Sequence, residues 1–125
     1  MIYIYKADLI RVVDGDTVEL MIDQGFGNFT KQTMRLYGID APEIRTAAGK
    51  EAKAWLWEAL QPLEAIYVET IQHKTKAKQD KYGRFLAVLY GDLKDLRANL
   101  PPKTLCVESI NAKMVVEGHA KERYW

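Results

Sequence analysis

Hydrophobic and polar residues alternate along much of the first third of the chain, a pattern typical of strands with one face in a core. Within 18–22, Val18, Leu20 and Ile22 share one face, and the intervening residues share the other. Later stretches rich in β-branched and aromatic residues indicate further strands. The sequence predicts five strands, at 9–13, 18–22, 29–37, 64–71 and 84–90. Asp14-Gly15 is a dipeptide that supplies positive φ in tight hairpins, so we expect a hairpin between the first two strands.

The period changes after Pro42. Apolar residues then recur at steps of one, three or four, which predicts a helix over 47–60 with Thr46 as its N-cap. Trp57 lies off the apolar stripe, and we expect it at the rim of the core. A second helix is expected after the cap Ser109, with Gly118 at its end. Between the last strand and this helix, 91–104 is expected to be a loop with a helical turn at 93–100.

Five strands in hairpins, with one helix after the third and one after the fifth, are typical of a small closed barrel such as the OB-fold. The predicted class is therefore mainly β with α (α+β). With 125 residues, 48% of them apolar, a single domain over 1–125 with one core is expected. No apolar run approaches the ~18 residues of a membrane span, so no membrane association is expected.

Charge and cysteine content narrow the function classes only slightly. The formal net charge is +1, which does not mark a nucleic-acid binder by itself. Basic residues nevertheless gather between 71 and 84, namely Lys74, Lys76, Lys78, Lys81 and Arg84, against the single acid Asp80. This run is either a solvated loop or a binding surface, and the sequence leaves both open. Cys106 is the single cysteine, which excludes an internal disulfide and predicts a small core residue.

Acids and arginines gather in three short segments, 14–17, 35–43 and 80–84. Asp16 has the parity of Val18 and Leu20, and a carboxylate on a core face is costly unless it is paired or bound to a metal. An acidic hairpin turn is the simpler explanation. Asp40 and Glu43 are equally compatible with a turn that leads into a helix.

Arg35 has the opposite parity to Met34 and Leu36, so it points away from the expected core. It could grip a phosphate or act as a structural partner of Asp40 or Glu43. Neither histidine, His73 or His119, lies in a metal-ligand spacing, and no glycine-rich phosphate loop is present. Hard oxygen ligands alone indicate Ca²⁺ or Mg²⁺.

The segments 13–18, 35–43 and 80–87, with a weaker match at 111–118, resemble the thermonuclease family, the staphylococcal-nuclease-like domains. The resemblance implies an OB-fold barrel that uses one Ca²⁺ ion to cut DNA, single- or double-stranded, and RNA. It also implies little sequence specificity and 3′-phosphate ends. The alternative is a non-catalytic nucleic-acid-binding or protein-interaction module of the same fold.

The resemblance also assigns roles residue by residue. Asp16 and Asp40 resemble the carboxylate ligands of the cation, and the backbone carbonyl of Ala41 resembles a third ligand. Glu43 resembles the general base for the attacking water. Arg35 and Arg84 resemble the two arginines that grip the phosphate. The groups that hold a neighbouring phosphate or its nucleotide are implied to be Lys81, Tyr82 and Tyr124.

The resemblance is imperfect in two places. The 91–104 segment is longer than the matching turn in the staphylococcal type, so contacts near the second helix are expected to differ. The sequence stops at Trp125, where typical relatives continue into a further C-terminal helix, so that helix is expected to be missing. This leaves both a monomer and a homodimer open. No signal peptide is apparent, which indicates a cytoplasmic protein unless a leader was removed.

Overall fold

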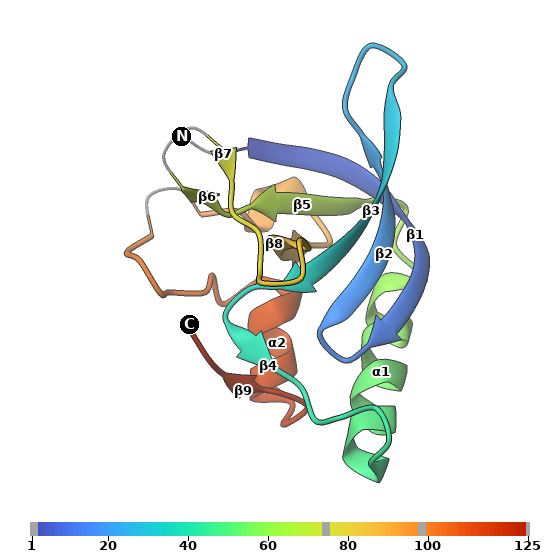
Figure 1. The fold of residues 1–125 in the computed structure, drawn as a ribbon, viewed down its shortest axis with the longest axis vertical. Coiled ribbons are helices and arrows are strands. Elements are labelled where there is room, and N and C mark those ends of the chain that lie inside the picture. The colour runs from blue at the N-terminus through green and yellow to red at the C-terminus, as the bar shows by residue number, and fades with distance from the viewer. Residues whose placement is uncertain (1–2, 74–75, 98–99, 125) are drawn as a thin grey trace.

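The computed structural model describes residues 3–73, 76–97 and 100–124. Its centre is a closed barrel of five strands in the order β1-β2-β3-β8-β5 (Figure 1). These strands are β1 (Tyr3–Asp14), β2 (Thr17–Asp23), β3 (Phe29–Leu36), β8 (Phe85–Tyr90) and β5 (Ile66–Thr70). All pairs are antiparallel except β3 with β8, which run parallel. The predicted α+β barrel of five strands is confirmed, although β1 begins six residues before the predicted start.

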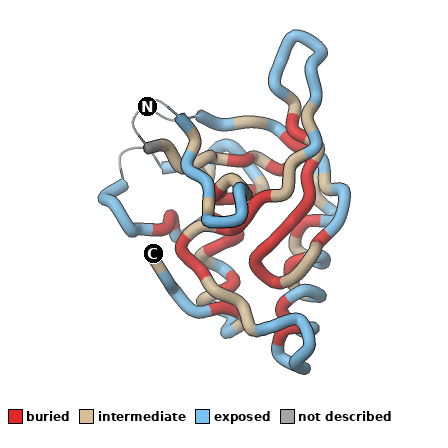
Figure 2. The backbone as a smooth tube through the Cα atoms, viewed as in Figure 1, coloured by how far each residue is buried: buried red, intermediate tan, exposed pale blue. Residues whose placement is uncertain are grey.

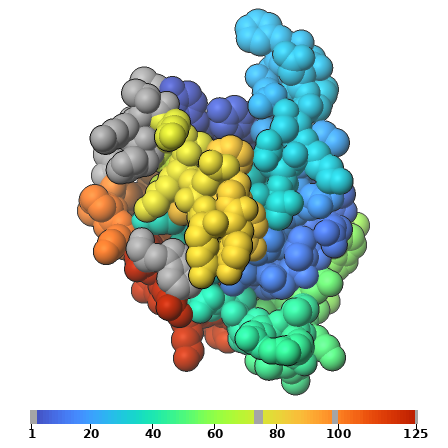
Figure 3. All heavy atoms as spheres, in the orientation of Figure 1, coloured from blue at the N-terminus to red at the C-terminus, as the bar shows by residue number. Residues whose placement is uncertain are grey.

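The barrel interior follows the predicted alternation. Val18, Leu20 and Met34 are buried inside it, and the buried positions in Figure 2 follow the barrel strands and the helix faces turned toward them. The β2–β3 hairpin extends beyond the barrel, so its tip is exposed (Figure 3). Cys106 is buried, as expected for a small core residue.

Helix α1 (Ala47–Leu60) has the predicted bounds and packs beside β1. The Thr46 hydroxyl oxygen accepts a hydrogen bond from the Gly49 N–H at 2.9 Å, which confirms the predicted cap. Ala52, Leu56 and Leu60 form its buried stripe, whereas Trp57 is 46% exposed at the rim. Neither helix in the described part of the chain is long and apolar enough to cross a membrane.

Helix α2 (Ile110–Val116) is capped by Ser109, whose hydroxyl oxygen accepts from the Ala112 N–H at 3.1 Å. Gly118 adopts φ 81°, and bonds from the Gly118 and His119 N–H groups to carbonyls of the last turn complete a Schellman motif. Asn111 is fully buried and fixes the helix to the barrel: its amide donates to the carbonyls of Tyr37 and Ala87, and its oxygen accepts from the Leu89 N–H.

Three small elements complete the fold. Strand β4 (Ile39–Asp40) pairs with β9 (Lys121–Glu122), and β6 (Gln72–His73) pairs with β7 (Lys76–Ala77). A 3₁₀ turn, η1 (Leu93–Asp95), lies within the predicted helical turn. Residues 98 and 99 of that turn, Lys74 of the basic run, and Trp125 lie outside the described residues.

The reason for Gly15 differs from the prediction. Asp14 pairs with Thr17, so the hairpin is present, but Gly15 is not among the residues with positive φ. A Cβ atom on Gly15 would instead lie 2.7 Å from the Ala41 Cβ and 2.8 Å from the Ala52 Cβ. The explanation from turn geometry was therefore wrong. Glycine is needed because the hairpin packs directly against α1 and the turn after β4.

Candidate active site

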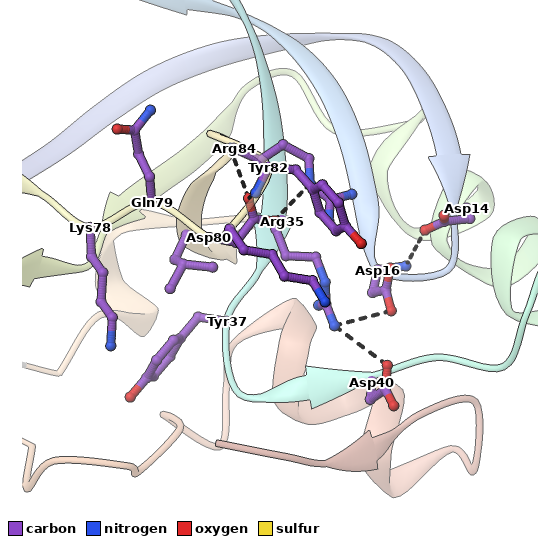
Figure 4. A pocket seen from close by; sticks show the side chains of 12 residues that line it. Asp14, Asp16, Arg35, Tyr37, Asp40, Lys78, Gln79, Asp80, Tyr82 and Arg84 are labelled. Carbon is purple, nitrogen blue, oxygen red and sulfur yellow. Dashed lines mark hydrogen bonds and ion pairs between the residues drawn. The ribbon is translucent and has the colours of Figure 1, made fainter. Parts of the chain in front are cut away.

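A pocket of about 550 Å³ opens where the three charged segments meet (Figure 4). The turn just before β2 supplies Asp16, the end of β3 supplies Arg35, and β4 supplies Asp40. The turn before β8 contributes residues 78–82 and Arg84. Asp16 and Arg84, 68 positions apart in the sequence, thus face one hollow because β2 pairs with β3 and β3 pairs in parallel with β8.

Arg35 is the centre of this group. One of its terminal nitrogens, Nη2, lies 3.4 Å from Asp16 Oδ2 and 3.5 Å from Asp40 Oδ1. The other, Nη1, donates to the Leu36 carbonyl at 2.7 Å. Arg35 has the predicted parity, with its neighbours in the barrel core, yet it is only 6% exposed. It pairs with Asp40, one of the two structural partners considered; Glu43 forms an ion pair with Arg45 instead.

Asp16 is a buried carboxylate held from several sides. Its Oδ2 accepts from the Ala41 N–H at 2.9 Å, and its Oδ1 accepts from the Thr17 hydroxyl at 3.2 Å. Burial raises the pKa of Asp16 from its ordinary 3.8 to about 6, and the nearby Asp14 adds to the rise, while Arg35 and the Ala41 N–H oppose it. A cation beside Asp16 would offset the energetic cost of burying its negative charge.

Arg84 is held by the turn that contains it. Its Nε lies 2.7 Å from Asp80 Oδ2, and its Nη1 donates to the Thr17 hydroxyl at 3.2 Å. Asp80 Oδ1 accepts from the N–H groups of Tyr82 and Arg84, both at 2.9 Å. Burial alone would raise the pKa of Asp80, but these hydrogen bonds and the guanidinium outweigh burial and lower it. Asp80 thus both shapes the turn and orients Arg84.

Lys81 and Tyr82 also line the pocket. Tyr82 is 71% exposed, with the Lys81 ammonium 5.2 Å and the Arg84 guanidinium carbon 5.4 Å from its ring centroid. These distances are within the range of cation–π contacts.

Glu43 and Tyr124 are not among the residues that line the pocket. Glu43 is exposed, and its Oε2 lies 2.9 Å from Arg45 Nη2. The turn that holds Glu43 rests on the first turn of α1, where a Cβ on Gly49 would collide with the Glu43 carbonyl oxygen. Tyr124 packs edge-to-face on Tyr37, with ring centroids 5.5 Å apart. Tyr124 therefore contacts a residue that lines the pocket, Tyr37, without lining the pocket itself.

Tyr37 and Arg123 are among the residues of this site to which the sequence assigned no role. Tyr37 lines the pocket, and Arg123 Nη1 lies 3.3 Å from Asp40 Oδ2, so Asp40 contacts a guanidinium at each oxygen. Arg123 reaches Asp40 because β9 pairs with β4 and the Arg123 N–H donates to the Gly38 carbonyl at 2.8 Å. No sequence motif signals a contact over 83 positions, whereas the strand parity shared by Arg35 and Tyr37 could have indicated Tyr37.

The donors suit a hard cation, although no three acidic, histidine or cysteine side chains among the described residues are grouped so that together they could hold a metal ion. Asp16 and Asp40 both contact the same nitrogen of Arg35, and Asp16 is a buried carboxylate that a cation would stabilise. These two aspartates supply the oxygen ligands that Ca²⁺ and Mg²⁺ prefer. The backbone N–H of Ala41 is engaged with Asp16.

The closed, mixed barrel of five strands with two helices defines an OB-like α+β fold. The pocket on this fold is lined by acidic residues and arginines. The chain matches the family described as "Staphylococcal nuclease homologue" over residues 33–125, and it belongs to that family.

Three relatives illustrate the range of similarity. "Micrococcal nuclease" of Shigella flexneri is 31% identical over 118 residues, covering 93% of this chain and 57% of the relative. "Protein ParB" of Escherichia coli is 29% identical over 115 residues, 92% and 55% of the two chains. An "Uncharacterized endonuclease" of Escherichia coli O157:H7 is 33% identical over 82 residues, 66% and 46%. The chain spans about half the length of the curated relatives it matches.

Proposed function

We propose that the protein is a Ca²⁺-dependent endonuclease that hydrolyses phosphodiester bonds of DNA and RNA and leaves 3′-phosphate ends. The observation behind the proposal is the convergence of Arg35, Arg84, Asp16 and Asp40 on one pocket. Family membership supports a nuclease, as do the names of two relatives, "Micrococcal nuclease" and "Uncharacterized endonuclease".

The two arginines suit phosphodiester hydrolysis because negative charge grows on the phosphate oxygens during the attack. Guanidinium groups that are already held in position stabilise this charge without reorganising. Arg35 is fixed by two carboxylates and a carbonyl, and Arg84 is fixed by Asp80. Arg84 keeps hydrogen-bonding capacity beyond its contacts with Asp80 and Thr17, since a guanidinium carries five N–H donors.

In this proposal Asp16, Asp40 and the Ala41 carbonyl hold the Ca²⁺ ion. When bound, the ion supplies positive charge at the phosphate and lowers the pKa of a coordinated water. Glu43 would accept the proton from the attacking water, a contribution of about 10²–10⁴-fold in rate. To do so it must leave Arg45, and an ion pair whose two side chains are 83% and 71% exposed is weak enough to allow this.

The proposed substrate contacts involve the sugar-phosphate backbone rather than base edges. Recognition of this kind gives little sequence specificity and a strong dependence on salt, and it accommodates single- and double-stranded DNA as well as RNA. Lys81 and Tyr82 would bind a neighbouring phosphate and its nucleotide at the pocket mouth. Tyr124 would support Tyr37 from behind.

Digestion of 5′-labelled single-stranded DNA tests the proposal. We expect cleavage with Ca²⁺ and none with EDTA, and we expect Arg84→Ala to lower the rate by at least about 10²-fold. Arg11→Ala is the matched control, because Arg11 forms a surface ion pair with Glu19 outside the pocket. The product ends should resist polymerase extension until a phosphatase removes the 3′-phosphate. Undiminished cleavage by Arg84→Ala would refute the assigned site.

A binding module without catalysis is the second candidate. It is favoured by the position of Glu43, which pairs with Arg45 away from the pocket, and by the engagement of both aspartates with arginines. Salt-dependent binding of single-stranded DNA with no cleavage in Ca²⁺ or Mg²⁺ would support this candidate over the nuclease.

A further inference from the structure

A second cavity, which we call the rear cavity, lies on the other side of Tyr37 from the active-site pocket. Its volume is about 290 Å³, near the lower end of the roughly 300–1,000 Å³ of small-ligand sites. One wall is the outer face of β5 and β8, and the other is formed by Arg97, residues 100–104 and Cys106. Tyr37 lines both hollows, and in Figure 4 it lies on the side of the pocket away from Asp14.

The rear cavity contains one carboxylate, that of Glu69, whose Oε1 accepts a hydrogen bond from the Tyr90 hydroxyl at 3.1 Å. Within the described chain this hydroxyl is its sole hydrogen-bond partner. Cys106, which also lines the cavity, is already engaged, with Sγ 3.1 Å from Glu108 Oε2. Glu69 therefore has acceptor capacity left for a ligand that brings N–H donors.

The remaining lining combines apolar side chains with the polar side chains of Arg97, Lys103 and Thr104. Ile71 and Val88 line the barrel side, and Pro101 lines the opposite side. With the ring of Tyr37, they suit a planar group with apolar faces and a polar edge, which describes a nucleobase. Guanine carries two adjacent N–H donors on its Watson–Crick edge, and these match the two oxygens of a carboxylate. The corresponding edges of the other bases place an acceptor beside the donor.

We propose that the rear cavity binds the base of a nucleotide next to the scissile phosphate and that Glu69 selects guanine there. This inference rests on the nuclease function proposed above. Lys103 lines the same cavity, is exposed, and has no ion-pair partner among the described residues, so it would contact the phosphate of that nucleotide. The phosphate-directed pocket thus remains nonspecific, and the neighbouring cavity adds a base preference.

Binding of 5′-GMP and 5′-AMP to the metal-free protein, followed by NMR chemical shifts, tests the subsite without requiring cleavage. We expect GMP to bind at least about tenfold more tightly, as for one good bidentate base contact. Glu69→Gln should abolish the difference, while Glu64→Gln, at an exposed carboxylate outside the cavity, should preserve it. Equal binding of the two nucleotides by the wild type would overturn the proposal.

Lys103→Ala gives a second test that does not depend on the folding of Glu69→Gln, because Lys103 is exposed. It should weaken GMP binding severalfold and leave guanosine binding unchanged. An equal loss for both ligands, or no loss for either, would contradict the assigned contact.

Cut positions in a random-sequence single-stranded DNA separate this proposal from the nuclease proposal. We expect guanine to be enriched at one fixed position beside the cut, and Glu69→Gln to remove the enrichment. Cleavage without guanine enrichment would refute the subsite and leave the nuclease standing. A preference for GMP in a protein that cuts nothing would support the base site and refute the nuclease.

Discussion

The two arginines of the candidate site are held in opposite ways. Arg35 is buried between Asp16 and Asp40 at the end of a barrel strand. Arg84 is partly exposed, on a turn shaped by Asp80. Because Arg35 is buried with its charged partners, the stability of the fold depends on it. The position of Arg84 depends instead on the local hydrogen bonds of its turn. Residues with the same proposed role should therefore fail differently when they are changed.

Removal of Arg35 should have the largest effect. Arg35→Ala leaves two aspartates without their shared guanidinium, and we expect a loss of about 3–5 kcal/mol in the free energy of unfolding at pH 7. Arg84→Ala should cost less than about 1 kcal/mol, because its ion pair is partly exposed. Urea denaturation of both variants measures the contrast. Equal losses in the two variants would contradict the distinction between the buried Arg35 and the partly exposed Arg84.

The pKa of Asp16 predicts how the free energy of unfolding of the protein depends on pH. In EDTA the pKa rises from 3.8 in the unfolded chain to about 6 in the folded protein. The stability of wild type relative to Asp16→Asn should therefore be greatest below about pH 4, and it should fall by up to about 3 kcal/mol as the pH passes 6. A difference that does not vary with pH would contradict the burial of this carboxylate. Ca²⁺ at pH 7 should stabilise only the wild type.

A change in the turn that holds Arg84 should have a moderate effect on the free energy of unfolding and a larger effect on the cleavage rate. Asp80→Ala removes the acceptor for two backbone N–H groups and the partner of Arg84. We expect a loss of about 1–2 kcal/mol in the free energy of unfolding, together with a tenfold or greater fall in cleavage rate as Arg84 loses its orientation. Calorimetry and the DNA digestion measure the two quantities. Full activity in Asp80→Ala would show that Arg84 needs no support.

The smallest effect is expected at the exposed pair of Glu43 and Arg45. Arg45→Ala should change the free energy of unfolding by less than about 0.5 kcal/mol, since the pair is exposed to solvent. If Glu43 is the base, activity should hold or rise in Arg45→Ala and fall by about 10²–10⁴-fold in Glu43→Gln. Unchanged kcat in Glu43→Gln would remove Glu43 from the mechanism.

Several features could be predicted because they depend on local rules. The caps Thr46 and Ser109, the glycine end at Gly118 and the parity of Arg35 follow from short-range geometry. The explanation for Gly15 failed because a hairpin rule could not anticipate its contact with Ala41 and Ala52. Arg123 was missed for a similar reason, as strand pairing, not spacing, brings it to Asp40.

By itself, the sequence determined which elements form and which of their faces enter the core, since periodicity and capping act over a few residues. It also carried the three charged segments that identified the family. Only the tertiary structure decided which charges meet. The parallel pairing of β3 with β8 and the pairing of β4 with β9 brought these charges together, and the packing of distant segments formed a second cavity behind Tyr37. Those outcomes depend on contacts between residues far apart in the chain, which no local pattern encodes.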